Sequence, residues 1–190
     1  MVKPYIQLLD DAKANYKFHL IDSAGHNLQW YPLLEDSIKD FRNGNIRNTY
    51  PDYLIWQTDN PEKFNRNHWV VINGLGNVDE ESKFEDINID DDQIVKAFPR
   101  QKESGIIEVK KTGNVISVKT EGIEQYILLL SPEHINFNDP IKILTNGILS
   151  FEGTVSKSVE VVLKWAATDF DPKMLFGAEL EIEVGEDFEP

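Results

Sequence analysis

His26 is the side chain best placed by its neighbours in the sequence to do chemistry. It follows Gly25 in a turn between an apolar segment, Phe18–Ile21, and an amphipathic stretch that begins at Pro32. Imidazole titrates near neutral pH, so a histidine in such a turn can take a proton from a hydroxyl nucleophile and return it to a leaving group. We therefore predict that His26 is a general base, with a loop histidine or a helix cap as the alternative interpretation.

The serine and the acid that would complete a catalytic triad with this histidine are missing from the sequence. A nucleophile elbow needs the pattern Gly-x-Ser-x-Gly between a strand and a helix, and no such pattern occurs. Ser23 belongs to the same turn as His26, and Ser104 lacks the leading glycine. Asp22 is too close along the chain to be the acid. We predict that this chain alone does not turn over substrate.

Two aromatic residues, Trp30 and Tyr31, follow the histidine at the start of the amphipathic stretch. They are candidates for lining a substrate pocket. The alternative is that they pack the helix against a sheet or a second domain, since large aromatic side chains dominate such contacts.

A helix, a strand and a second helix are the elements that would position these residues. Pro4 suits the first turn of a helix, and the apolar side chains after it recur on one helical face. Phe18–Ile21 is expected to be a strand, and the second helix is expected to end at the Asn43-Gly44 cap. A unit with one strand cannot bury both faces of that strand by itself.

This helix–strand–helix segment resembles the C-terminal end of an α/β-hydrolase in the esterase and prolyl-oligopeptidase-like branch, where the triad histidine comes last in the chain. The resemblance implies that residues 1–46 are a remnant of the catalytic domain and that His26 is its triad histidine. The implied partner is the missing N-terminal part of that domain. On this interpretation the chain is an inactive fragment of a serine hydrolase that acts on esters or peptides.

The remainder, residues 47–190, has the period-two hydrophobicity of β-strands. Strands are expected at 53–58, 68–72, 105–111, 115–120, 126–130, 140–145, 148–153 and 176–184, and a helix near 159–166. Gly113-Asn114 and Asn146-Gly147 mark hairpin turns, and the continuous apolar run 126–130 indicates a central strand. We predict an α+β chain in which the hydrolase remnant is followed by a mostly antiparallel β-sandwich with one helix.

Several motifs of this part also look similar to the domain that follows the catalytic domain in some of these hydrolases. Their order along the chain carries the resemblance. The motifs are Arg47, Pro51–Trp56, Arg66–Trp69, Asp139–Ile141, Asn146-Gly147, Phe151–Gly153 and Asp171–Ile182. The resemblance implies that residues 47–190 are an accessory domain.

Composition limits the classes of partner. The 190 residues carry a formal net charge of -14, which disfavours nucleic acid and anionic membrane surfaces as partners. There is no cysteine, so disulfides and thiolate chemistry are excluded. No signal peptide and no apolar run long enough to span a membrane are found, which predicts a soluble protein. The compartment stays open, because the parent protein could be exported.

We predict no metal site and no cofactor. Within the acidic tract 79–92, the spacing of Asp86, Asn88 and Asp90 is that of an EF-hand start, yet Asp91 and Ala97 stand where glycine and glutamate are required. An irregular calcium site and a solvated loop remain the alternatives for this tract. The four histidines show no paired ligand spacing.

A second class of function stays open, in which the β-rich part is a non-catalytic module that binds a carbohydrate or a protein. His68-Trp69 could then be an exposed binding pair, although Trp56, Trp69 and Trp165 each lie in an apolar run that favours the core. Self-association of an incomplete hydrolase piece is a third alternative.

Overall fold

The structure is a computed structural model that describes residues 3–21, 25, 28–76, 87–90, 93–95 and 104–185. Contacts along the backbone divide the chain into two compact units. The N-terminal unit comprises residues 1–48 with 84–99, and the two-sheet unit comprises residues 49–83 with 100–190.

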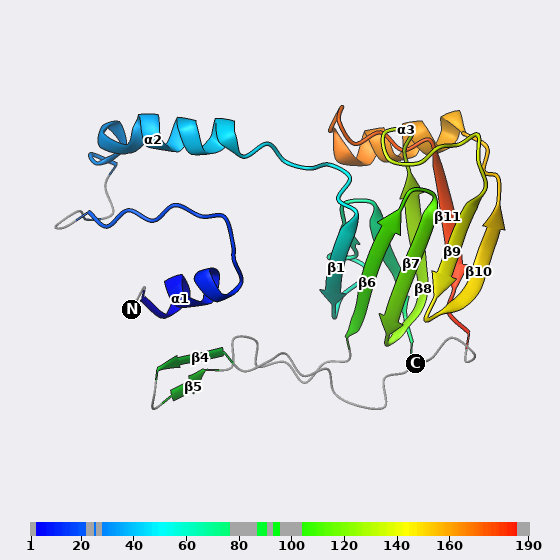
Figure 1. Cartoon of the computed structure of the whole chain (residues 1–190), viewed down its shortest axis with the longest axis horizontal. Helices are drawn as coiled ribbons and strands as arrows, with labels where there is room; N and C mark the ends of the chain where they lie inside the picture. Colours follow the sequence, from blue (N-terminus) through cyan, green and yellow to red (C-terminus); the bar gives the residue numbers. More distant parts are fainter. Residues whose placement is uncertain are drawn as a thin grey trace. The chain divides into compact units, whose positions relative to one another are not determined.

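The N-terminal unit contains two helices and a small antiparallel strand pair (Figure 1). Its elements are α1 Lys3–Asp11, α2 Tyr31–Gly44, β4 Ile87–Asp90 and β5 Gln93–Val95. Pro32 lies in the first turn of α2, as expected from its fixed backbone geometry. The strand expected at Phe18–Ile21 is wrong, since this segment has no regular secondary structure. A strand needs a neighbour for its backbone hydrogen bonds, and no described strand pairs with this segment.

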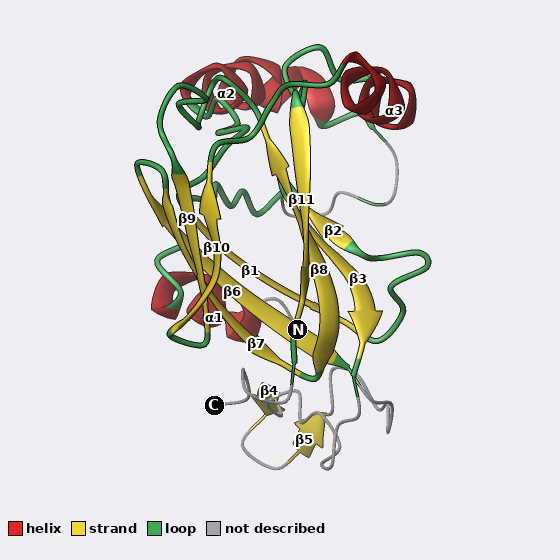
Figure 2. Ribbon diagram, turned by 90° about the vertical axis from the view of Figure 1, so that its right-hand side faces the viewer, coloured by secondary structure: helices red, strands yellow, loops and turns green. Residues whose placement is uncertain are grey.

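The two-sheet unit contains a mixed five-stranded sheet and an antiparallel four-stranded sheet, which face one another in Figure 2. The first has the order β1 Tyr53–Thr58, β6 Gly105–Thr112, β7 Val115–Glu121, β9 Ile141–Thr145 and β10 Ile148–Gly153. The second has the order β11 Ala178–Glu183, β8 Ile123–Leu130, β3 Val70–Leu75 and β2 Arg66–Asn67. Only the β7–β9 pair of the first sheet is parallel. The α+β class expected from the sequence is therefore confirmed.

Both predicted hairpin turns are present. Asn146 and Gly147 have φ values of 50° and 86°, and they connect β9 to β10. A two-residue turn in which both residues have positive φ matches the twist of the two strands that it connects. Asn and Gly tolerate positive φ better than other residues, which explains the Asn-Gly sequence there. Gly113, with φ 59°, occupies the turn between β6 and β7.

Side chains from both sheets form one hydrophobic core. Tyr126–Leu130 of β8 are all buried, and β8 pairs with β11 on one side and β3 on the other, so the predicted central strand is confirmed. The helix α3, Val159–Asp169, is capped by Ser158, whose hydroxyl accepts a hydrogen bond from the amide of Val161.

Candidate functional site

The turn that carries His26 lies outside the described residues, and so do the neighbouring Asp22 and Ser23. The aromatic pair after it is described. Trp30 is half-buried and immediately precedes α2, while Tyr31, the first residue of α2, is exposed. Their ring centroids are 6.4 Å apart at 61°, an edge-to-face contact. The two rings therefore pack on each other, and their exposure leaves both the pocket and the packing interpretation open.

The N-terminal unit has apolar side chains but no core among its described residues. In residues 5–21 and 28–48 no side chain is fully buried. The exposed fraction reaches 76% for Leu20 and 78% for Leu33. Eight further large apolar side chains of this segment are also exposed: Tyr5, Leu8, Leu9, Phe18, Leu28, Tyr31, Ile38 and Ile46. Isolated exposed apolar residues are ordinary, but here many of them lie within one short segment.

Ser104 does not have the environment of a nucleophile. It is buried next to the start of β6, and its hydroxyl accepts a hydrogen bond of 2.9 Å from Nε2 of Gln57. A nucleophilic serine must instead stand exposed beside a general base. The contact with Gln57 is therefore consistent with a structural role for Ser104, as expected from the missing glycine before it.

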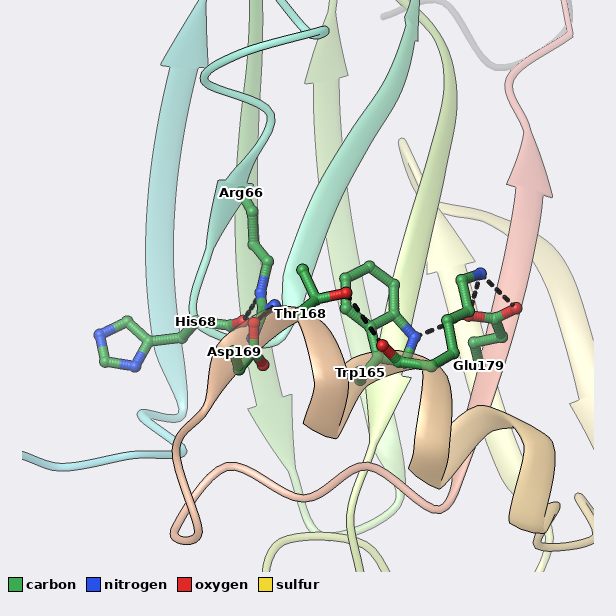
Figure 3. Close-up of polar contacts among 7 residues, drawn as sticks. Arg66, His68, Trp165, Thr168, Asp169 and Glu179 are labelled. Atoms are coloured by element: carbon green, nitrogen blue, oxygen red, sulfur yellow. Dashed lines mark hydrogen bonds and ion pairs between the residues drawn. The ribbon is translucent and has the colours of Figure 1, made fainter.

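The two-sheet unit contains a polar network that fastens α3 to the sheets (Figure 3). The guanidinium of Arg66 donates through Nη1 and Nη2 to the two carboxylate oxygens of Asp169 at 2.6 and 2.8 Å, and through Nε to the carbonyl of His68 at 2.6 Å. Its carbon Cζ lies 5.0 Å from the ring centroid of Trp165 and 5.1 Å from that of Phe176. Since the guanidinium is already paired and stacked, this arrangement suits structure better than ligand binding.

The second half of this network joins α3 to β11. The indole of Trp165 donates to a carboxylate oxygen of Glu179 at 2.8 Å, and Lys164 pairs with the same carboxylate at 2.9 Å. Thr168 donates to the carbonyl of Lys164 within the helix. Glu179 lies on β11, and α3 covers its carboxylate and makes it half-buried.

Three tryptophans of the two-sheet unit were predicted to be core residues. Trp69 and Trp165 are buried, which confirms the prediction for them, and Trp56 is partly buried against the core. The indole of Trp69 donates to the carbonyl of Pro51, and that of Trp56 to the carbonyl of Phe64. His68-Trp69 as an exposed binding pair is therefore wrong, because Trp69 has no exposed surface.

His134 is a titratable residue that sequence reasoning did not single out. It is half-buried, with its ring stacked on Tyr50 and close to that of Trp69, and desolvation lowers its pKa from 6.5 to about 4. No motif or spacing could have indicated it, because its neighbours are far away in the sequence. Arg66 belongs to one of the motifs named from the sequence, but its pairing with Asp169 was not foreseen, since the two residues are 103 positions apart.

No group of three histidine, aspartate or glutamate side chains that could hold a metal ion occurs in the part of the chain that the structure describes. The side chains of the acidic tract 79–92 lie outside that part. The irregular calcium site and the solvated loop therefore both stay open as alternatives for this tract.

None of the described helices is long and apolar enough to cross a membrane. The chain was also compared with known proteins. No family model, no curated protein and no solved structure matches it.

Proposed function

We propose that this chain is the C-terminal part of a serine α/β-hydrolase that acts on esters or peptides. Residues 1–46 complete its catalytic domain, and residues 47–190 are a β-sandwich-like accessory domain. His26 is the general base that serves a serine located in the N-terminal part of the catalytic domain. The chain alone is inactive, because its sequence contains neither the serine elbow nor the acid.

The observation that supports this proposal most is the apolar surface of the N-terminal unit. Leu20, Leu28 and Leu33 are each more than two-thirds exposed. Burying one such side chain contributes about 1.5–3 kcal/mol, so a segment that leaves several of them in water lacks its stabilising contacts. In a complete catalytic domain, a β-sheet would cover the apolar faces of the two helices and supply those contacts.

The two-sheet unit has the opposite character. Its core residues extend from Leu54 to Ile182, and they include a fully buried Trp69, Tyr126 and Phe176. A unit with a core of its own can be attached to an enzyme without sharing the core of the catalytic domain. This difference between the units supports an accessory role for residues 47–190.

The first experiment uses the chain as it is. A fluorophosphonate probe, which labels activated serines, and a p-nitrophenyl ester should both give no reaction above the buffer background. Labelling of a serine in this chain would overturn the inactive-fragment proposal, since the sequence would then contain a working nucleophile.

The second experiment uses the coding sequence upstream of residue 1, where we expect an open frame that encodes Gly-x-Ser-x-Gly. In the longer protein, His26→Ala should lower kcat by about 10³-fold or more, because the serine loses its base. The matched control is His19→Ala, which removes a histidine from the same segment whose ring lies 3.2 Å from the hydroxyl of Ser37. Full activity in His26→Ala would contradict the assignment.

A binding module is the second candidate, and exposed side chains near β1 favour a protein partner for it. Tyr53 and Ile55 of β1 and Phe64 are exposed, whereas Trp69 is not, which favours an apolar protein contact over a sugar platform. Self-association through this surface predicts a dimer in size-exclusion chromatography with light scattering. A monomer at all concentrations, together with hydrolysis by the longer protein, would exclude self-association.

A further inference from the structure

The imidazole ring of His134 is held in an aromatic cage. It stacks on the ring of Tyr50 at a centroid distance of 4.6 Å and an angle of 12°, and it lies 5.2 Å from the ring of Trp69. Both ring nitrogens are buried, and neither has a hydrogen-bond partner among the described residues. Since a neutral imidazole always carries one N–H, the cage holds an unsatisfied donor even before protonation.

One wall of this cage belongs to a short segment, residues 49–52, which we call the strap. It precedes β1 and has no ladder partner of its own. The carbonyl of Thr49 contacts Nδ1 of His68 at 3.1 Å, and the carbonyl of Pro51 accepts from the indole of Trp69 at 2.9 Å. Tyr50 supplies the ring that covers His134. The hydroxyl of Tyr50 also donates to the carbonyl of Leu175 at 3.3 Å, and its ring lies edge-to-face with that of Phe176. The strap is thus held by side-chain contacts and single backbone hydrogen bonds.

The charged groups around the cage oppose a positive ring. Lys111 of β6 has a side chain only 8% exposed, and its Nζ lies 2.6 Å from a carboxylate oxygen of Asp52, which is 71% exposed. Lys111 also donates its amide to the carbonyl of Asp52 at 2.8 Å. Burial is the largest cause of the lowered pKa of His134, Lys111 lowers it further, and Asp52 acts in the opposite direction. Burial is the largest cause that raises the pKa of the Tyr50 phenol, and the charges of Glu133 and Asp171 raise it further.

We propose that His134 is an acid-sensitive latch, and that protonation of its ring releases the strap while the two sheets stay folded. An imidazolium in the cage would leave two charged N–H donors without acceptors, beside a buried lysine. Contact with the faces of Tyr50 and Trp69 attracts a cation, but this gain is smaller than the cost of an ion without hydrogen bonds. Trp69 is fixed next to β3, so Tyr50 and its strap are the wall that moves.

The direction of the pH effect follows from proton linkage. With the strap closed the pKa of His134 is about 4, and with the strap open the ring is solvated and titrates near 6.5. The open form therefore binds the proton first as pH falls. Between pH 6.5 and 4 the ratio of closed to open strap should drop about tenfold per pH unit.

Release of the strap would change the connection between the two units. Residues 45–48 follow α2, and the strap comes directly after them. When the strap leaves the sheets, residues 49–52 join that connecting segment, and its reach increases by roughly 3.3 Å for each residue added. The inference concerns the two-sheet unit alone, so it does not depend on the hydrolase proposal.

Hydrogen exchange of two N–H groups reports on the strap directly. The indole N–H of Trp69 donates to Pro51, and the amide of Lys111 donates to Asp52. Their protection, corrected for intrinsic exchange, should fall about tenfold per unit from pH 6.5 to 4.5. The amide of Asn146, which donates to the carbonyl of Val118, exchanges only when the sheets themselves open, so it should stay better protected than the strap groups at every pH. Protection of the strap groups that does not change with pH, or protection at Asn146 no higher than theirs, would overturn the proposal.

The variant His134→Phe keeps the stacking ring and removes the titration, so its strap protection should not change with pH. His19→Phe is the matched control and should behave like the native chain. A pH-dependent loss that persists in His134→Phe would refute the latch. Should this variant not fold, the NMR titration of His134 in the native chain decides, since protection at Trp69 must fall from about pH 6.5 and level off at the measured midpoint of His134.

Discussion

Arg66 of β2 and Asp169, the last residue of α3, form a two-pronged ion pair across 103 positions of sequence. Their side chains are only 16% and 14% exposed, and the guanidinium carbon of Arg66 lies 5.0 Å and 5.1 Å from the ring centroids of Trp165 and Phe176. Removal of one partner from such a pair leaves a charge that water reaches poorly. The contact is therefore the clearest place to test how α3 is held.

Asp169→Asn should lower the free energy of unfolding by about 3 kcal/mol, because the guanidinium of Arg66 loses its counter-ion in a largely buried place. Urea unfolding followed by fluorescence measures the change. Glu152→Gln on β10, where the side chain is exposed, is the control and should change stability by less than about 0.5 kcal/mol. A loss below about 1 kcal/mol for Asp169→Asn would contradict the role given to this pair.

Trp165→Phe should destabilise the two-sheet unit by about 1–2 kcal/mol, since the carboxylate of Glu179 loses the indole donor while Lys164 remains. Glu179→Gln keeps an acceptor for the indole and should cost less. The two variants are compared by thermal unfolding under identical conditions. The reverse order would show that the ion pair with Lys164 matters more than the indole contact.

Gly105→Ala should destabilise the two-sheet unit by about 1–3 kcal/mol through overpacking. An added Cβ would lie 2.7 Å from Cγ1 of Ile123 and 2.8 Å from the carbonyl oxygen of Gly122, and the backbone cannot move aside cheaply. Gly153→Ala is the matched control, because its Cβ would meet only Phe151 at an ordinary 3.5 Å. Equal urea midpoints for the two variants would disprove the argument.

The stability of the two-sheet unit should fall between pH 10 and 12 because of Tyr126. Burial is the largest cause that raises the pKa of this phenol to about 12, and hydrogen bonds with Thr145 and Ser150 act in the opposite direction. The unfolded chain loses the proton near pH 10 and the folded chain does not, so stability is complete below pH 10. It should then decrease by about 1.4 kcal/mol per pH unit.

Tyr126→Phe provides the control for this alkaline effect. The variant loses the 2.6 Å contact with the hydroxyl of Thr145 and should be less stable at neutral pH by about 1–2 kcal/mol. The stability difference between native chain and variant should shrink as pH rises above 10. A difference that stays constant up to pH 11.5 would show that the phenol titrates as it does in water.

Local patterns in the sequence predicted those elements whose formation depends on near neighbours. Asn146-Gly147 predicted a hairpin because few other residue pairs adopt two positive φ values, and the structure has φ 50° and 86° there. The apolar run of β8 predicted a central strand because a strand covered on both faces has no polar side. The strand expected at Phe18–Ile21 did not form, since alternation alone supplies no partner for its backbone.

By itself, then, the sequence determined the α+β class, the hairpins and most strands of the two-sheet unit, because these follow from residues close together in the chain. Tertiary structure alone decided that Arg66 meets Asp169, that α3 covers Glu179, and that His134 is enclosed by Tyr50 and Trp69. The physical reason is that burial and charge pairing depend on which distant segments meet, and hydrophobic periodicity carries no information about that choice.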